Sequence, residues 1–215
     1  MNAEDYISRI DSDYYGNLAP VLIHKQKMIL EEVGRILASL AQDPEHAPAE
    51  HIRTRIKRAE SLEKKLEKQG FAPGAVSGVQ NLTDIIGVRI VTHFVGDVYS
   101  VLGEIKASPL WQVTLIKDYI SYPKPNGYRS LHAIIEFPAE VPGGHLSAEI
   151  QLRTIAMDCW ASLEHQLKYK KDIENAELIV SELKRCADEI ASTDLTLQTL
   201  REIIRSSSSA TTLLQ

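Results

Sequence analysis

Three cations at alternate positions of the segment 51–57 are residue types that bind phosphate. Arg53, Arg55 and Lys57 are two residues apart, so in an extended strand they share one face. Like charges in such a row repel one another unless an anion lies against them. We interpret the row as a candidate phosphate cradle, continued by the helix predicted after it. The alternative is an exposed edge strand that its charges protect from aggregation.

Two carboxylates accompany neighbouring predicted strands. Asp84 comes just before an apolar strand, and Glu149 alternates with apolar residues on the strand at 146–153. Taken singly, Asp84 is typical of a turn or cap and Glu149 of a solvated strand face. Beside a row of cations, a pair of carboxylates predicts a Mg²⁺–nucleotide site. Mg²⁺ takes one or two carboxylates and completes its shell with phosphate oxygens and water.

The segment 117–132 has an unusual composition for a plain connection. It holds three tyrosines, three cations and a histidine around the turn Pro-Lys-Pro-Asn-Gly, which is a rigid turn sequence. A tyrosine ring stacks on a purine base, and lysines beside it hold phosphates as point charges. We interpret the segment as a nucleotide-binding loop; the alternative is an ordinary loop anchored by its tyrosines.

The elements expected to position these residues follow a helix–sheet–helix order. Three-to-four spacing of apolar residues predicts helix over the first 40 residues. Alternation predicts five strands, at 51–57, 88–92, 111–115, 131–137 and 146–153. Further helices are predicted at 59–69, at 97–107 and from residue 154 onward, with a flexible loop or lid at 70–78 and a frayed end at 206–215. The pattern predicts an α/β fold, in which a small mixed sheet of about five strands is flanked by helices, with long N- and C-terminal helices.

The C-terminal helix carries an apolar stripe, formed by Ala176, Ile179, Leu183, Ala187 and Ile190 and continued less regularly by Leu197, Leu200 and Ile204. The terminal helices together offer more apolar surface than one sheet face needs. This favours a homo-oligomer, a tetramer being one form. The alternative is that the stripe packs within one chain.

Composition narrows the class of protein. The 215 residues are 44% hydrophobic with a net charge of −5, and lack an apolar run long enough to cross a membrane. The cysteines, Cys159 and Cys186, are far apart, so we expect a reducing, cytoplasmic location. Residues 51–70 carry +4 and residues 115–132 carry +2, while the rest carries −11. This distribution argues against a general nucleic-acid binder and favours a focused site for a small anion.

Known nucleotide-binding fingerprints are missing from the sequence, which has neither a P-loop nor a Gly-x-Gly-x-x-Gly motif. Five other motifs follow one another instead: Arg-Ile-Lys at 55–57 with Ser61, Asp-Ile-Ile-Gly-Val-Arg at 84–89, Asp-Tyr-Ile at 118–120, Pro-Lys-Pro-Asn-Gly-Tyr-Arg-Ser-Leu-His at 123–132, and Glu-Ile-Gln-Leu-Arg-Thr at 149–154. This ordered set, extended by residues 155–165, resembles the RelA/SpoT-type alarmone synthetase domain over about residues 50–170. The resemblance implies a nucleotidyltransferase-like fold and a stand-alone small alarmone synthetase. Such an enzyme transfers pyrophosphate from ATP to the 3′-hydroxyl of GDP or GTP, giving ppGpp or pppGpp plus AMP.

The resemblance also implies roles for individual residues. Asp84 and Glu149 would hold Mg²⁺, and Glu149 would help to deprotonate the attacking hydroxyl. ATP would be bound by Arg55, Lys57, Ser61, Lys65 and Arg89. GDP or GTP would be bound by Lys117, Lys124, Asn126, Tyr128, His132, Gln151, Arg153 and Asp158. Within that set Tyr128 would stack on guanine, and Asp158 would accept hydrogen bonds from its N1–H and 2-amino groups.

We expect three segments: an N-terminal helical segment at 1–49, the synthetase domain at 50–170 and a C-terminal helical extension at 171–215. The length leaves no room for the hydrolase domain of the long relatives, so no hydrolase activity is expected. Two alternatives remain open. The same chemistry could act on an adenine nucleotide or on the 3′ end of tRNA, or the chain could be a catalytically silent regulator that binds nucleotide or RNA.

Overall fold

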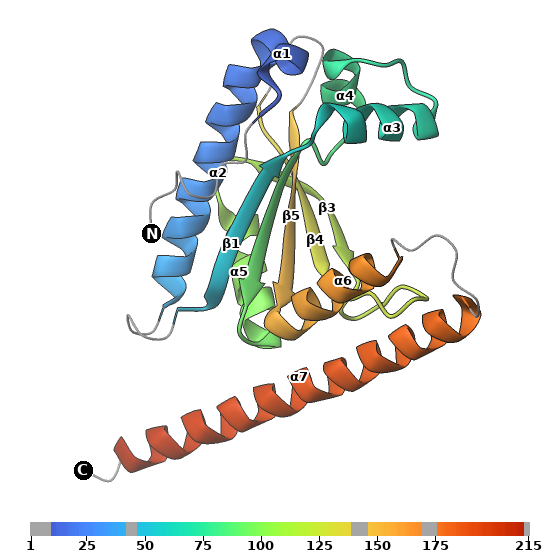
Figure 1. Cartoon of the computed structure of the whole chain (residues 1–215). Coiled ribbons are helices and arrows are strands. Elements are labelled where there is room, and N and C mark those ends of the chain that lie inside the picture. Colours follow the sequence, from blue (N-terminus) through green and yellow to red (C-terminus); the bar gives the residue numbers. More distant parts are fainter. Residues whose placement is uncertain (1–9, 42–46, 139–145, 169–175, 213–215) are drawn as a thin grey trace.

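Five strands form one mixed sheet in the computed structural model, which describes residues 10–41, 47–138, 146–168 and 176–212 (Figure 1). They are β1 (Ala49–Ile56), β2 (Ile86–Thr92), β3 (Gln112–Asp118), β4 (Leu131–Glu136) and β5 (Ser147–Thr154). The strand order is β1-β2-β5-β4-β3; β2 and β5 are parallel, and the other neighbours are antiparallel. The predicted mixed sheet of about five strands is confirmed. β3 runs three residues beyond the predicted strand, because its ladder with β4 continues to Asp118.

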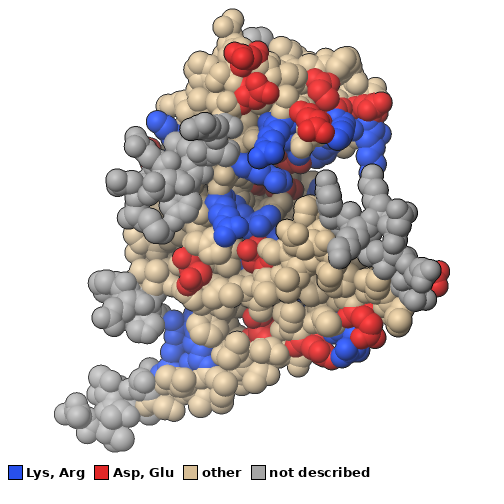
Figure 2. Space-filling view, viewed as in Figure 1, with Lys and Arg blue, Asp and Glu red and all other residues tan. Residues whose placement is uncertain are grey.

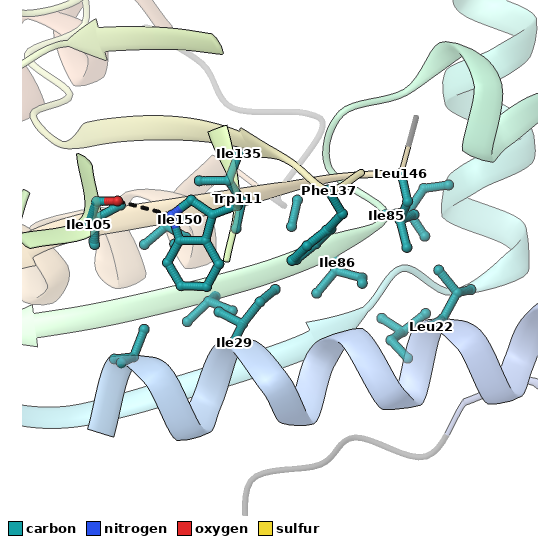
Figure 3. Packing of buried hydrophobic residues seen from close by; sticks show 14 of the residues in the cluster. Leu22, Ile29, Ile85, Ile86, Ile105, Trp111, Ile135, Phe137, Leu146 and Ile150 are labelled. Atoms are coloured by element: carbon teal, nitrogen blue, oxygen red, sulfur yellow. Dashed lines mark hydrogen bonds between the residues drawn. The ribbon is translucent and has the colours of Figure 1, made fainter. Parts of the chain in front are cut away.

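One face of the sheet forms the hydrophobic core with α2 (Ala19–Leu40) and α5 (Val95–Ala107). Figure 3 shows Leu22 and Ile29 of α2 pointing at side chains of the sheet, with Trp111 and Phe137 between the layers. The Trp111 Nε1–H donates to the Ile105 carbonyl at 2.9 Å, so its polar atom is satisfied in the core. Fully burying each such side chain stabilises the fold by about 1.5–3 kcal/mol. The other face of the sheet is left for polar side chains.

The N-terminal helical region has three parts. A short helix α1 (Ser12–Tyr15) and a 3-10 turn (Gly16–Leu18) precede α2, which has proline in its first turn. Proline suits that position because its missing N–H needs no partner there. Residues 1–9 of the predicted helix lie outside the described residues.

Two helices follow β1: α3 (Ala59–Gln69), with the predicted bounds, and α4 (Ala75–Asn81). Gly70 ends α3 at φ 76°, which favours glycine. The flexible loop predicted for 70–78 is wrong in its second half. Gly78 lies inside α4 against Leu62, and a Cβ at position 78 would come within 2.7 Å of the Leu62 side chain. Close packing on α3 thus stabilises a helix that its small residues alone do not predict.

The chain ends in α6 (Ile155–Lys168) and the long α7 (Ala176–Thr212), which crosses the end of the sheet beneath α6 (Figure 1). The frayed end predicted at 206–215 is wrong through Thr212, because α7 continues to that residue; residues 213–215 lie outside the described part. Ala187 is buried, whereas Leu197, Leu200 and Ile204 are exposed. Among the described residues, no helix is long and apolar enough to cross a membrane.

Candidate active site

A row of polar residues crosses all five strands on the face opposite the core. Arg53 pairs with Arg89, Arg89 with Gln151, Gln151 with His132, and His132 with Lys117. Side chains of residues paired in this way project to the same face of a sheet. The register therefore brings together cations that lie as far as 64 positions apart in the sequence. β1 is also an edge strand of the sheet. The alternative interpretation of its charges, protection of an exposed edge from aggregation, therefore agrees with the structure as well.

A second row runs beside the first, with Arg55 paired to Gly87 and Gly87 to Glu149. A Cβ at position 87 would lie 3.7 Å from the Arg55 side chain, so glycine keeps the space between Arg55 and Glu149 open. A cavity of about 270 Å³ lies here, and its lining includes three arginines and two carboxylates: Arg53, Arg55, Arg89, Asp84 and Glu149. Figure 2 shows Lys and Arg gathered around a hollow on this face.

Asp84 lies at the α3 side of the cavity, two residues before β2. A backbone hydrogen bond from Lys57 to the Ile85 carbonyl at 2.8 Å holds this turn against β1. Lys57 and Lys65 each place Nζ 2.8 Å from Asp84 Oδ2. Burial raises the pKa of Asp84, but the hydrogen bonds and charges of the two lysines outweigh it and hold the pKa below its usual range. Asp84 Oδ1 is buried with no hydrogen-bond partner among the described residues.

Glu149 is part of a closed ring of hydrogen bonds. His132 Nδ1 lies 3.1 Å from Oε1, and the Gln151 amide donates to Oε2 at 2.7 Å. His132 Nε2 lies 2.9 Å from the Tyr128 hydroxyl, and Arg153 donates to both that hydroxyl and the Gln151 carbonyl. Burial opposes ionisation of Glu149, but His132, Gln151 and the charge of Lys65 outweigh it and lower the pKa to about 2. Glu149 is therefore ionised at neutral pH.

Asp158, in the first turn of α6, joins the two ends of the site. Its Oδ1 accepts from Arg89 at 3.0 Å and from Arg153 at 3.2 Å. Burial and the nearby Arg153 lower the pKa of Arg89, while Asp158 partly compensates by stabilising its charge. The residue expected to accept hydrogen bonds from guanine thus binds two arginines in this structure.

The loop between β3 and β4 is held from both sides. At its start, Asp118 Oδ1 accepts from the backbone N–H groups of Ile120 and Ser121, and Oδ2 from the Tyr99 hydroxyl at 3.1 Å. Near its end, Asn126 donates to Glu164 of α6 at 3.1 Å, and its side-chain carbonyl accepts from the Tyr128 backbone at 3.2 Å. The Asn126 side chain therefore stabilises the shape of the loop.

The aromatic residues of this loop form a compact group. Tyr119, Tyr128 and His132 pack edge to face in pairs, with ring centroids 5.4–6.0 Å apart. Lys124 Nζ lies 4.6 Å from the Tyr119 ring and 4.8 Å from the Tyr128 ring. Most of the site residues predicted from the sequence thus contact one another or line the cavity. Among the described residues, the structure does not bring the side chain of Ser61, in the first turn of α3, or that of Lys117, at the far end of the row, into contact with them, and both are exposed.

Sequence reasoning assigned no role to Asp118, Tyr119 or Glu164. An aspartate followed by backbone donors two and three residues later is an Asx-type turn, so the sequence contains a signal for Asp118. The partners of Tyr119 and Glu164 depend on how the loop folds back, for which the sequence contains no local signal.

The donor set of the cavity fits a magnesium ion bound together with phosphates. Asp84 and Glu149 line the same cavity, and the Asp84 Oδ1 atom lacks a partner among the described residues. Within the same part of the chain, no three His, Cys, Asp or Glu residues cluster as a metal cage. Mg²⁺ needs no such cage where one or two carboxylates and substrate phosphates complete its shell.

Comparison with known proteins agrees with this geometry. Residues 54–174 match the family described as "Region found in RelA / SpoT proteins". GTP pyrophosphokinase YwaC of Bacillus subtilis is 43% identical over 145 residues, which are 66% of this chain and 69% of that protein.

Solved structures of similar proteins extend the comparison to the fold. Small alarmone synthetase 1 from Bacillus subtilis, bound to its product pppGpp, has a TM-score of 0.77 at 27% identity and covers 90% of this chain and 99% of its own. The same protein bound to AMPCPP has a TM-score of 0.71 at 25% identity, covering 91% and 100%.

Proposed function

The chain belongs to the RelA/SpoT family, and we propose that it is a GTP pyrophosphokinase that makes (p)ppGpp. It transfers pyrophosphate from ATP to the 3′-hydroxyl of GDP or GTP and releases AMP. The observation that carries the proposal is the pair of carboxylates, Asp84 and Glu149, in one cavity with three arginines. A site of this kind suits phosphoryl transfer, in which catalysis is mostly positioning and charge neutralisation.

We assign the donor ATP to the side of the cavity formed by β1, the start of β2 and α3. Arg55 and Arg89 are suited to the phosphates and to the adenine face, because a guanidinium binds phosphate with a fork of donors and also stacks on rings. Lys57, Ser61 and Lys65 bind the donor phosphates. Lys57 and Lys65 support this assignment because both already contact a carboxylate oxygen, an anionic group like a phosphate oxygen.

We assign the acceptor GDP or GTP to the side formed by the β3–β4 loop, β4, β5 and α6. Tyr128 stacks on guanine and Asp158 reads its N1–H and 2-amino groups, two donors that adenine does not present together. The remaining acceptor residues hold ribose and phosphates: Lys117, Lys124, Asn126, His132, Gln151 and Arg153. Several of these side chains bind one another, so we expect the nucleotide to replace some of those contacts.

We propose Mg²⁺ as the cofactor, held by Asp84 and Glu149 together with substrate phosphates. When bound, the ion neutralises charge that develops on the transferred group. Asp84 Oδ1 supports this proposal because a buried carboxylate oxygen without a partner is costly unless a ligand completes it.

The reaction is an attack of the acceptor's 3′-oxygen on the β-phosphorus of ATP. The new bond joins these two atoms, the bond between the β-phosphorus and the α–β bridging oxygen breaks, and AMP leaves. Glu149 accepts the hydrogen bond of the attacking hydroxyl and orients it. Glu149, whose pKa is lowered to about 2, is ionised and can accept this hydrogen bond, and the proton of the hydroxyl passes to solvent as the new bond forms. Arg55, Lys57 and Lys65 stabilise negative charge on the transferred phosphates.

The test is transfer of label from ATP labelled at the γ-phosphate, with Mg²⁺ and one of four acceptors: GDP, GTP, ATP or tRNA. We expect label on GDP and GTP, with one AMP released per product. Label on ATP or on tRNA instead would show the same chemistry with a different acceptor. If no label were transferred to any of the four, the enzyme assignment would be contradicted. The remaining interpretation would be a regulator that binds nucleotide or RNA.

We also propose that the enzyme is a cytoplasmic homo-oligomer that associates through α7. Alternating spacings of four and three connect Ile179, Leu183, Cys186, Ile190, Thr193, Leu197, Leu200 and Ile204 along this helix, Cys186 taking the place of Ala187 in the stripe described above and Thr193 being the one polar member. Such spacing is typical of a coiled-coil seam. Its second part is exposed, with Leu197, Leu200 and Ile204 at 46%, 50% and 66%. A tetramer and the division at 49/50 and 170/171 remain predictions.

Sedimentation velocity tests the association through α7. The double change Leu200→Ser and Ile204→Ser should shift wild-type oligomer to monomer with little loss of helicity. If wild type and the double variant had the same sedimentation coefficient, the apolar residues of α7 would play no part in association.

A further inference from the structure

The C-terminal helix α7 begins after residue 174, where the family match ends, yet it contacts the acceptor side of the site at three places. These places are the turn at Gly127, the side chain of Arg129 and the hydroxyl of Thr154. Each is next to a residue assigned above to the acceptor nucleotide. The inference that follows rests on that proposed function and concerns what these contacts do for it.

The first contact is a close approach of backbone. Gly127 has φ 88°, a conformation that favours glycine. A Cβ at position 127 would lie 2.6 Å from the Ala187 Cβ and 3.2 Å from the Lys184 Cα. The turn between Asn126 and Tyr128 therefore packs directly against α7. This contact constrains the position of Tyr128, the next residue along the chain.

The second contact is an ion pair one residue beyond Tyr128. Arg129 Nη2 lies 2.9 Å from Asp188 Oδ1, and the Arg129 side chain is 17% exposed. Asp188 also pairs with Lys184 one helical turn earlier at 2.8 Å. Arginine on the loop and aspartate on α7 thus hold the C-terminal side of the turn.

The third contact is at the junction of β5 and α6. Asp194 is 4% exposed and accepts from the Thr154 hydroxyl at 2.6 Å. The same hydroxyl accepts from the Met157 backbone N–H in the first turn of α6 at 3.1 Å. Thr154 follows Arg153 directly, and Asp158 lies one turn further on. Burial raises the pKa of Asp194, and the hydrogen bond from Thr154 opposes this by favouring the ionised form.

We propose that Asp188 and Asp194 of α7 are positioning residues for the acceptor nucleotide. Asp188 fixes the turn that presents Tyr128, and Asp194 fixes the junction that presents Arg153 and Asp158. Helix α3, and the end of β1 that leads into it, lie at the other end of the sheet from α7 (Figure 1). The consequence is selective: loss of either contact weakens binding of GDP much more than binding of ATP, although Arg89 on the donor side shares Asp158 with Arg153.

The experiment compares matched pairs of variants on the same helix. Asp188→Asn removes the partner of Arg129, and Glu189→Gln is its control, because Glu189 is exposed and pairs within α7 with Arg185. Asp194→Ala removes the partner of Thr154, and Thr193→Ala is its control, because Thr193 is exposed and bonds only within α7 among the described residues. Calorimetry measures the Kd of GDP and, separately, of AMPCPP.

For Asp188→Asn and Asp194→Ala we expect the Kd of GDP to rise about three- to tenfold, as for one lost hydrogen-bonding contact. The Kd of AMPCPP should change less than about twofold, and both controls should match wild type. Asp194→Asn keeps an oxygen acceptor for Thr154, so it should restore most of the GDP affinity even where Asp194→Ala lowers the melting temperature.

Equal weakening of GDP and AMPCPP would assign these residues a general structural role and overturn the inference, as would unchanged affinity for both ligands. A wild-type chain that binds neither nucleotide gives a different result. It would contradict the proposed function itself, and with it the inference built on it.

Discussion

The two sides of the active site differ in how their charged groups are held. On the donor side, Arg53 and Arg55 are exposed on an edge strand, and Lys57 and Lys65 contact Asp84 through single ion pairs. On the acceptor side, Arg153 and His132 are buried, and five side chains form a closed ring of hydrogen bonds around Glu149.

This difference indicates how each substrate is recognised. A buried ring of hydrogen bonds leaves its side chains little freedom, so ordering them around an acceptor costs little conformational entropy, even where the nucleotide replaces some of these contacts. Lysines on flexible stems are point charges that follow a phosphate group. The acceptor side is therefore built for shape and identity of the base, and the donor side for charge.

The largest effect is expected where the two sides meet, at the carboxylates. Asp84→Asn and Glu149→Gln should each lower the rate of AMP release by about 10³-fold, because several kcal/mol of charge stabilisation are lost. Circular dichroism should show an intact fold. Glu60→Gln, which removes an exposed carboxylate on α3, is the control, and near wild-type activity of either site variant would refute the assignment.

A smaller and one-sided effect is expected at Tyr128. Tyr128→Ala should weaken GDP binding by about 1–3 kcal/mol through loss of stacking. Tyr128→Phe keeps the ring and removes only the hydroxyl that contacts His132 and Arg153. We expect it to cost less, and calorimetry with GDP separates the two contributions. A larger cost for Tyr128→Phe than for Tyr128→Ala would contradict the stacking role.

On the donor side the effect of one cation should be modest. Arg55→Gln should raise the KM for ATP about fivefold, consistent with about 1 kcal/mol from an exposed charge-assisted contact. The KM for GDP should stay the same. Lys68→Gln, at the far exposed end of α3, is the matched control, and an equal rise in both KM values would remove the distinction between the sides.

The last effect concerns stability at low pH and leaves nucleotide binding aside. The folded-state pKa of Glu149, about 2, is below its usual value of 4.5. A lowered acid pKa adds stability that is present above pH 4.5 and is lost as the pH falls towards 2. The contribution is on the order of 3 kcal/mol at most. Denaturant unfolding should show the difference between wild type and Glu149→Gln shrinking over this range; a constant difference would mean that the ring does not stabilise the carboxylate.

Local pattern was sufficient for much of the fold and for the composition of the site. Alternation placed Arg53, Arg55 and Lys57 on one face, and the helix at 59–69 has the predicted bounds. These features depend on residues that are close together in the sequence, so they can be predicted from one sequence. The roles of the site residues remain predictions, although the register places their side chains together.

Features that depend on distant packing could not be predicted. Helix α4 contains a glycine that disfavours helix, and it forms because Gly78 fits against Leu62. The ring around Glu149 depends on the pairing of β4 with β5, and Asp194 depends on how α7 docks. A single sequence determines neither the register of β4 against β5 nor the angle at which α7 docks in a way that local patterns reveal.

The most direct test of the two-sided site is a pair of dissociation constants measured on the same two variants. Calorimetry with AMPCPP and with GDP is applied to Lys65→Gln and Tyr128→Ala. We expect Lys65→Gln to weaken AMPCPP about fivefold or more and to leave GDP within about twofold. Tyr128→Ala should do the reverse. If both variants weakened both nucleotides to the same degree, the division into a donor side and an acceptor side would be wrong.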